Sequence, residues 1–209
     1  MNIFKKINVE ILIRALACAL VLSAALSLVS FDATCSEIRN NVLRLHIKAN
    51  SDSESDQALK LKVRDAVLEV SESVFADCQS LGEAYDAADQ NLGLFNTVAQ
   101  NTVYAMGYDY PVSVSVGESW FETREYETFT LPAGTYEAIK INIGDAQGKN
   151  WWCVMFPALC VPSATVTPSD SFDEDAEKIV TEPEGYEVRF KAVEVFEKIR
   201  HTLCDLFGF

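Results

Sequence analysis

Histidine, proline and glycine are all scarce in this sequence: its 209 residues include two His, six Pro and nine Gly. The two histidines, His46 and His201, are far apart, and neither stands at a metal-ligand spacing. A catalytic triad would have to recruit one of them without a supporting motif. The low proline and glycine content is atypical of a disordered chain. We therefore expect an ordered protein without a cofactor or metal, and we do not expect an enzyme.

Basic residues are also few, and the formal net charge is −14. Residues 1–34 hold three of the 17 basic and two of the 31 acidic residues, so the rest of the chain has 14 basic and 29 acidic residues. Such a surface repels the phosphates of nucleic acid and of anionic lipid. The composition thus predicts no nucleic-acid partner, and solubility is a sufficient reason for the acidity.

The N-terminal segment has the features of an export signal. An uncharged run of 17 residues, Ala15–Phe31, follows a basic flank. The run is longer than most signal-peptide cores and shorter than most membrane-spanning helices. Because the basic end stays in the cytoplasm, the chain after Asp32 is expected to lie outside it. Residues 1–34 are therefore either a cleaved signal peptide or an uncleaved anchor that contacts the membrane through residues 11–31, and both alternatives stay open.

The next part of the chain predicts one α+β domain over residues 35–162, in which an antiparallel β-sheet packs against two long helices. Alternating apolar residues over 42–47 indicate a strand with one buried face. Apolar residues at spacings of three and four predict one helix over 54–76 and another over 81–106.

Strand patterns follow the second helix. Valines alternate with serines over 112–116, and two further strand-like segments cover 121–131 and 136–143. The turn residues Pro132–Gly134 between the last two predict an antiparallel hairpin. The apolar run Trp151–Val161 predicts another buried strand.

Two cysteines in that run, Cys153 and Cys160, are candidates for a disulfide. They are seven residues apart, the chain can bend at Pro157 between them, and an extracytoplasmic location permits oxidation. The bridge would stabilise the fold by about 2–3 kcal/mol. Two buried free thiols are the alternative. The other three cysteines after the export segment are odd in number and suggest no pairing.

The C-terminal part changes in composition. Residues 163–184 are rich in Ser, Thr, Pro and acids and predict a flexible acidic linker. Residues 185–209 predict an amphipathic helix. Its apolar stripe consists of Val188, Ala192, Val195, Ile199, Leu203 and Leu206. The stripe must dock on the domain, on a partner or on a membrane, and the acidic linker and mixed charges make the membrane the least favoured.

Two segments resemble ligand-binding loops but favour simpler interpretations. Acids alternate over 52–56 as in a calcium loop, but Gln57 and Val63 occupy the positions where an EF-hand needs Gly and Glu. These acids suit a helix start capped by Ser53 instead. Gly144–Asn150 is faintly like a phosphate loop, but the spacing is one residue short and no helix pattern follows, so a turn between strands is favoured.

Two separate blocks of the sequence closely resemble the stage II sporulation protein R family. The first is LRLHIKANSDS at 43–53, continued by DQALKLKVRDAV at 56–67. The second is LPAGTYEA at 131–138, followed by GKNWWCVMFP at 148–157. The blocks are long and in the same order as in the family, and the resemblance covers about 43–161.

The resemblance implies a function. Members of that family are made in the forespore of endospore-forming bacteria and exported into the space between forespore and mother cell. There they trigger a membrane-embedded aspartic protease of the mother cell to cleave the sigma-E precursor. No catalytic residue is carried over. We expect receptor contacts from the charged first helix of the domain and the turn before Trp152. The candidates are Asn50, Asp52, Asp56, Lys60, Arg64, Lys149, Asn150 and Trp152.

Two other classes of function compete with signalling. A wall hydrolase would need a facing pair of carboxylates, and no acid pair stands out from the sequence. A non-catalytic carbohydrate- or wall-binding module would use exposed aromatic rings, for which Trp151 and Trp152 are candidates, although core packing suits them equally. A cleft with carboxylates would favour the hydrolase, a shallow aromatic groove the binding module, and a polar convex surface the signalling protein.

Overall fold

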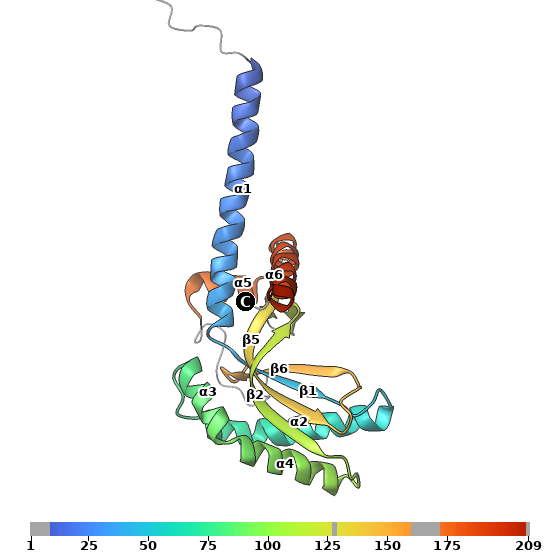
Figure 1. Ribbon diagram of the computed structural model, residues 1–209. Coiled ribbons are helices and arrows are strands. Elements are labelled where there is room, and N and C mark those ends of the chain that lie inside the picture. Colours follow the sequence, from blue (N-terminus) through green and yellow to red (C-terminus); the bar gives the residue numbers. More distant parts are fainter. Residues whose placement is uncertain (1–8, 127–128, 160–171, 208–209) are drawn as a thin grey trace, which may run out of the picture.

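The computed structural model describes residues 9–126, 129–159 and 172–207, and it has the expected α+β architecture. A four-stranded sheet separates two layers of helices (Figure 1): α2, α3 and α4 lie on one side, and α1, α5 and α6 lie on the other. The helices are α1 (Val9–Arg39), α2 (Glu54–Phe75), α3 (Leu81–Gln90), α4 (Leu92–Ala105), α5 (Glu174–Thr181) and α6 (Glu187–Phe207). The strands are β1 (Leu43–Lys48), β2 (Val112–Phe121), β3 (Arg124–Glu125), β4 (Thr130–Leu131), β5 (Gly134–Ile143) and β6 (Asn150–Phe156).

The sheet is mixed rather than wholly antiparallel. Its strand order is β2-β5-β1-β6, and the central pair β1 and β5 is parallel, with Leu45 opposite Ile139 and Ile47 opposite Ile141. The other two pairs are antiparallel. A parallel pair requires a long crossover, and here the crossover is the whole stretch from α2 to β4. The alternation of apolar residues predicts each strand but not the strand that it pairs with. The parallel pairing of β1 with β5 was therefore not predicted from the sequence.

The first core lies between the sheet and α2 to α4. Apolar side chains from the two central strands meet the inner stripes of α2 and α4, and all of them are almost fully buried. They include Leu43, Leu45, Ile47, Leu59, Val63, Val67, Phe95, Val103, Ile139 and Ile141. The predicted helix over 54–76 is confirmed by α2.

The second predicted helix is interrupted. Residue Asn91 has φ −106° and ψ 13°, so α3 ends there and α4 begins at the next residue. Its side-chain amide donates to the carbonyl of Ala87 at 2.8 Å, which satisfies a carbonyl at the end of α3. Asparagine readily bonds local backbone groups in this way. The prediction of one helix over 81–106 was therefore wrong, because the apolar period continues across the break.

The predicted hairpin between 121–131 and 136–143 was also wrong. The antiparallel partner of β5 is β2, with Phe121 opposite Gly134, and the intervening residues form a separate two-stranded ladder of β3 and β4. Gly134 has φ 148°, and a Cβ there would lie 2.4 Å from Cδ of Arg39. The turn residues thus make room for an arginine of α1 instead of closing a hairpin.

The second core lies on the opposite side of the sheet and depends on both ends of the chain. Phe31, Cys35 and Ile38 of α1 are buried against side chains of α5 and α6. Part of the expected linker, residues 163–184, is the helix α5, whose Ala176, Ile179 and Val180 are buried. The composition of α5 resembles that of a linker, because only three of its residues are buried and apolar and most of the others are acidic or polar. Residues 160–171 lie outside the described residues.

The C-terminal helix forms as expected, but it docks by another face. Phe190, Val193 and Glu197 are buried, whereas the predicted stripe is exposed at Val188, Val195, Ile199 and Leu203. Glu197 pairs with Arg39 at 3.7 Å, so a buried acid counts among the docking residues. The docking face of α6 was not predicted, because it includes the carboxylate of Glu197 and the prediction considered apolar residues only. The side chains beyond Leu203 lie outside the described part of the chain.

Candidate functional site

Most of the residues expected to contact a partner gather where the β1–α2 connection meets the β5–β6 loop. Two backbone hydrogen bonds join these loops, from Gln147 N to Asn50 O at 3.1 Å and from Gly148 N to Ala49 O at 2.9 Å. We call this region the junction surface, made of residues 50–56 and 144–149 with the adjacent face of α2. The favoured interpretation of 144–150 as a turn between strands is confirmed.

Asp56 is the centre of the junction surface. Its carboxylate is buried and accepts hydrogen bonds from the Ser51 hydroxyl at 2.6 Å and the Asn50 amide at 2.9 Å. Its backbone N–H donates to the hydroxyl of Ser53, so the capping interpretation is confirmed. Burial alone would raise the pKa of the Asp56 carboxyl, but hydrogen bonds from Ser51, Asn50 and Tyr110 outweigh burial and lower it.

Lys60 holds the second loop in place. Its ammonium is almost fully buried and donates to the carbonyl of Lys149 at 2.9 Å and to Gln57 Oε1 at 2.6 Å. Burial lowers the pKa of Lys60, while the nearby Asp52 carboxylate opposes that shift. Lys60 is therefore a buried structural cation, not an exposed contact residue.

Two glycines let the loops approach this closely. A Cβ on Gly148 would lie 2.2 Å from the carbonyl oxygen of Ser51, and one on Gly144 would lie 2.3 Å from Oδ1 of Asn50. Gly144 also has φ 58°, which disfavours other residues. The Oδ1 atom of Asn50 accepts from the backbone N–H of Asp145 at 3.0 Å. Asn50 thus connects Asp56 to the loop.

The exposed part of the junction surface carries charges of both signs. Asp52 accepts from the backbone N–H of Lys149 at 2.7 Å, and both side chains are exposed. Farther along α2, the Arg64 guanidinium lies 4.5 Å from the ring of Trp151 and pairs with Asp65. The charged groups of Asp52 and Lys149 are available to a partner.

Trp152 and Asn150 belong to the opposite face of the sheet. The Trp152 ring lies 6.1 Å from the rings of His46 and Phe121 and under the guanidinium of Arg124 at 4.9 Å. Asn150 Oδ1 is 2.9 Å from His46 Nε2. Burial is the main reason that the pKa of His46 is lowered. The eight candidates are therefore not one patch: most surround Asp56, and two lie behind the sheet.

Arg44 is a buried residue that the sequence analysis missed. Its guanidinium lies 4.0 Å from the centre of the Phe121 ring and 4.8 Å from that of Tyr136, and Nη2 donates to the Tyr126 hydroxyl at 2.7 Å. Within the described residues, Nε and Nη1 have no hydrogen-bond partner. Because Arg44 lies between Leu43 and Leu45 in the alternating pattern, the sequence placed its side chain on the exposed face of the strand. It is buried because helices cover both faces of the sheet.

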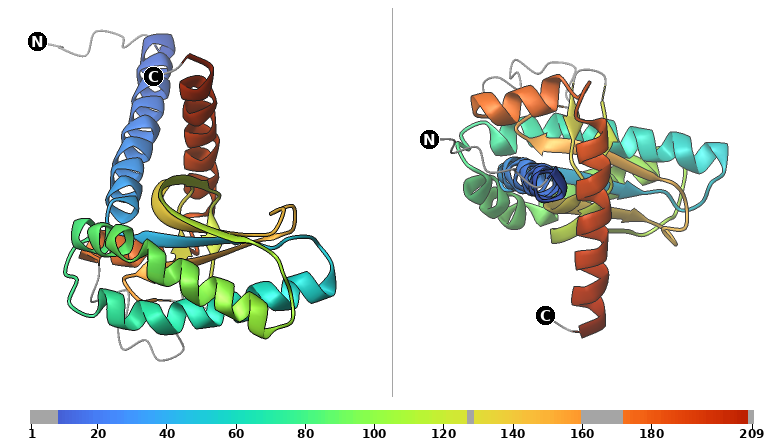
Figure 2. Two further views of the ribbon diagram at one scale, coloured as in Figure 1. Left: turned by 60° about the horizontal axis from the view of Figure 1, so that its bottom comes forward. Right: turned by 90° about the horizontal axis from the view of Figure 1, so that it is seen from above.

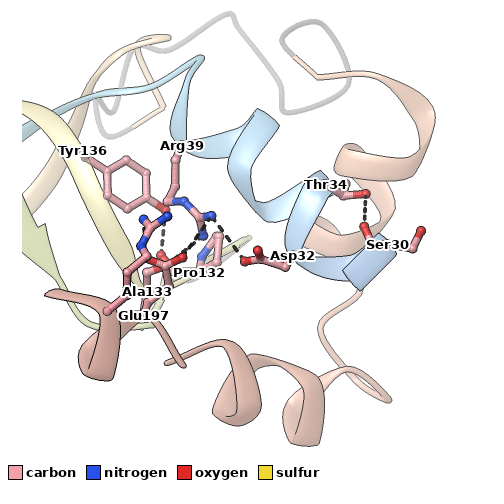
Figure 3. A network of polar contacts seen from close by, with 9 residues as sticks. Ser30, Asp32, Thr34, Arg39, Pro132, Ala133, Tyr136 and Glu197 are labelled. Carbon is pink, nitrogen blue, oxygen red and sulfur yellow. Dashed lines mark hydrogen bonds and ion pairs between the residues drawn. The ribbon is translucent and has the colours of Figure 1, made fainter. Parts of the chain in front are cut away.

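A second missed group ties α1 to α6 (Figure 3). Arg39 donates to the carbonyl of Ala133 at 3.1 Å and pairs with Asp32 at 3.4 Å and with Glu197. The hydroxyl of Tyr136 donates to the carbonyl of Pro132 beside it. Arg39 was overlooked because it stands in the stretch between the export segment and the first strand.

The candidate disulfide stays a prediction. Cys153 is buried in β6, and Cys160 lies outside the described residues. Across the described ranges, no group of three or more His, Cys, Asp or Glu side chains is placed to hold a metal ion.

One of the described helices, α1, is long and apolar enough to cross a membrane. Its span, Glu10–Arg39, contains an apolar window that is exposed throughout. Such a helix is compatible with a signal segment or with an anchor.

Comparison with known proteins gives two matches. The family described as Stage II sporulation protein R matches residues 39–166. The stage II sporulation protein R of Bacillus subtilis (strain 168) is 37% identical over 157 residues, which cover 74% of this chain and 70% of the relative. No solved structure matches. The family match contains the junction surface, Arg44 and Arg39, and it ends before α5 and α6.

Proposed function

Because the chain belongs to the stage II sporulation protein R family, we propose that it is an exported signalling protein of endospore formation. It is carried out of the forespore and activates a membrane-embedded aspartic protease of the mother cell, which then processes the sigma-E precursor. The observation that supports the location most strongly is α1, an exposed apolar helix that runs without interruption into the buried second core. It holds the domain at the outer face of the membrane as an uncleaved anchor.

The junction surface is the proposed contact surface for the protease. Buried Asp56 and Lys60 fix two loops that are distant in sequence, and the fixed loops present Asp52 and Lys149 to solvent. A rigid charged surface loses little conformational entropy when it binds. The protein activates by binding the active arrangement of the protease more tightly than the inactive one, so that only the difference in affinity shifts the equilibrium.

The carbohydrate-binding alternative gains no support from the tryptophans. Trp151 lies under Arg64, and Trp152 packs among Phe121, His46 and Arg124. Both indoles are half-buried, so the domain itself uses these rings.

The test is an immunoblot for processing of the sigma-E precursor in sporulating cells that lack the gene, complemented with variants. We expect the full chain to restore processing and Lys149→Glu to reduce it, because that change reverses an exposed charge and leaves the backbone bonds of the loop in place. Lys62→Glu, the same change at an exposed position of α2, is the matched control. Normal processing without the gene would refute the signalling function. If Lys149→Glu and Lys62→Glu restore processing equally, the proposed contact surface is refuted, but the signalling function is not.

A further inference from the structure

The length of α1 outside the domain matches a bilayer. Side chains from Ile11 to Ser30 are exposed, with Ser27 partly so, and Phe31 is the first that is buried. Twenty residues of helix span about 30 Å, which is about the thickness of the hydrocarbon core. If α1 crosses the membrane as proposed above, the outer boundary of the hydrocarbon therefore falls close to Phe31.

Helix α6 lies at this level and across the axis of α1. In the view along α1 (Figure 2, right), α1 is seen end on while α6 lies lengthwise beside it. Phe190 of α6 packs edge-on against Phe31 at 5.3 Å, and a shallow groove between the helices is lined by Leu28, Val29 and Phe196. A helix that crosses the axis of a membrane span at its end lies parallel to the membrane plane.

The face of α6 turned away from the domain is apolar. At about 100° per residue, the exposed apolar side chains fall within an arc of about 100°. They are Val188, Val195, Phe196, Ile199 and Leu203. The docking residues Phe190, Val193 and Glu197 point elsewhere, into the second core and the Arg39 network. The stripe thus lies on the face of α6 opposite the docking residues. The free part of α1 continues past α6 and away from the sheet (Figure 1).

The charges on α6 are arranged as in helices that lie in a membrane interface. On the helical wheel, Lys191 and Lys198 border one edge of the apolar stripe, and Arg189 and Arg200 border the other. The acids lie farther from the stripe: Glu194 pairs with Lys191, and Glu197 pairs with Arg200. Basic side chains beside an apolar face can reach lipid phosphates. The acidic linker and the mixed charges of this helix made a membrane the least favoured partner from the sequence, whereas the position of the basic residues beside the stripe favours it.

Aromatic residues at the start of α6 add to this pattern. Tyr186 stacks on Phe31 at 5.6 Å, and the Arg189 guanidinium lies 5.4 Å from the Tyr186 ring. Tyrosine with a basic neighbour is typical of the headgroup level of membrane proteins.

We propose that α6 is an interfacial helix that lies in the outer face of the membrane crossed by α1, with Val188, Val195, Phe196, Ile199 and Leu203 in the lipid. This inference rests on the anchoring part of the proposed function. Two attachments, one across the membrane and one along it, fix the domain in a single orientation. The junction surface, at the end of the sheet remote from α1 and α6 (Figure 1), is then held at a distance from this membrane.

Brominated lipids test the depth of α6. The full chain is reconstituted into vesicles of phosphatidylcholine and phosphatidylglycerol, with an environment-sensitive fluorescent amino acid at one position: Ile199 in the stripe, Glu194 on the other side of α6, or Leu20 in α1. An interfacial helix buries its apolar face about 5–10 Å into the headgroup and acyl boundary. Bromine near the top of the acyl chains is expected to quench the probe at Ile199 more than at Glu194. Bromine near the end of the acyl chains is expected to quench the probe at Leu20, because Leu20 lies at the middle of the span.

Each other outcome overturns the inference in an identifiable way. Quenching at Leu20 without quenching at Ile199 would leave the anchor intact and place α6 outside the lipid. A blue-shifted but unquenched probe at Ile199 would show that a protein, such as a second copy, covers the stripe. An unquenched probe at Leu20 would show that α1 is not inserted, and the anchoring part of the proposed function would then fail together with this inference.

Discussion

Asp56 is the residue on which the polar contacts of the junction surface converge. Replacing it with Asn keeps the shape but removes the charge that accepts from Ser51 and Asn50. Hydrogen bonds to a charged group contribute about 1.5–3 kcal/mol. We expect Asp56→Asn to lower the free energy of unfolding by about that amount, as measured by urea denaturation. Asp89→Asn, at an exposed position of α3, is the control and should have little effect.

The same carboxylate makes stability depend on pH in a defined direction. The pKa of Asp56 is lower in the folded protein than its ordinary value of about 3.9. The contribution of the Asp56 carboxylate to the free energy of unfolding is therefore fully present above about pH 4. It is lost as the pH falls through the pKa of Asp56 in the folded protein. We expect the acid-induced fall in unfolding temperature to be shallower in Asp56→Asn than in the unchanged protein. Parallel pH profiles would contradict this role for Asp56.

Arg44 leads to a less usual prediction at the residue scale. Its guanidinium is buried between two rings, and two of its nitrogens have no hydrogen-bond partner among the described residues. Replacing a buried charge with an apolar side chain of similar volume is often neutral or stabilising by about 1–4 kcal/mol. We expect Arg44→Met to maintain or raise the unfolding temperature, whereas Arg44→Ala leaves a cavity and lowers stability by about 2–4 kcal/mol.

The two Arg44 variants distinguish packing from charge. If Arg44→Met destabilises as much as Arg44→Ala, the guanidinium has a charge-specific role in the second core. Calorimetry of the purified full chain in detergent gives both unfolding temperatures under one condition. Loss of sigma-E precursor processing in a stable Arg44→Met variant would instead place Arg44 in the signalling function.

At the scale of elements, the contact between the β1–α2 connection and the β5–β6 loop depends on Gly148. A Cβ there would meet the backbone carbonyl of Ser51, which cannot move without moving α2. We expect Gly148→Ala to cost about 1–3 kcal/mol of stability, as overpacking usually does. The matched control is Gly93→Ala in α4, where nothing lies within 4 Å of the new Cβ. It should stabilise α4 by about 0.5–1 kcal/mol. Equal denaturation midpoints would refute the close approach.

The elements also show how far the sequence predicts this fold. Helix α2 follows a regular apolar period, and its start follows a recognisable cap, so both were predicted correctly. The break at Asn91 and the pairing of β5 with β2 were missed. The pairing of β5 with β2 depends on contacts between distant parts of the chain. The break at Asn91 depends on a local side-chain hydrogen bond that leaves the apolar period unchanged. A local period of two or of three to four therefore contains no information about either feature.

Only part of the candidate site could be predicted, because burial also depends on contacts between distant segments. Sequence resemblance identified the segments that form the junction surface but could not separate buried Asp56 and Lys60 from exposed Asp52 and Lys149. A charged residue in a helical or extended segment is normally assigned to the surface. Its burial follows only when a second loop covers it, as the β5–β6 loop does here.

For the whole molecule, the question is what holds the two ends of the chain together. Phe31 from the N-terminal helix is 2% exposed and contacts Tyr186 and Phe190 near the C-terminus. Arg39 and Glu197 add a buried ion pair between the same helices. The export segment and the second core therefore overlap in sequence, and removal of residues 1–34 would take an aromatic side chain out of that core.

This overlap predicts that the N-terminal segment is retained. We expect intact mass spectrometry of the protein from the membranes of sporulating cells to show a chain that still contains Phe31. Phe31→Ala should lower the free energy of unfolding by about 3–5 kcal/mol, as for other buried aromatics. Val29→Ala, two residues away on the exposed part of α1, should leave it unchanged. A mature chain that begins after residue 34 and unfolds at the same temperature as the full chain would show that the second core forms without α1.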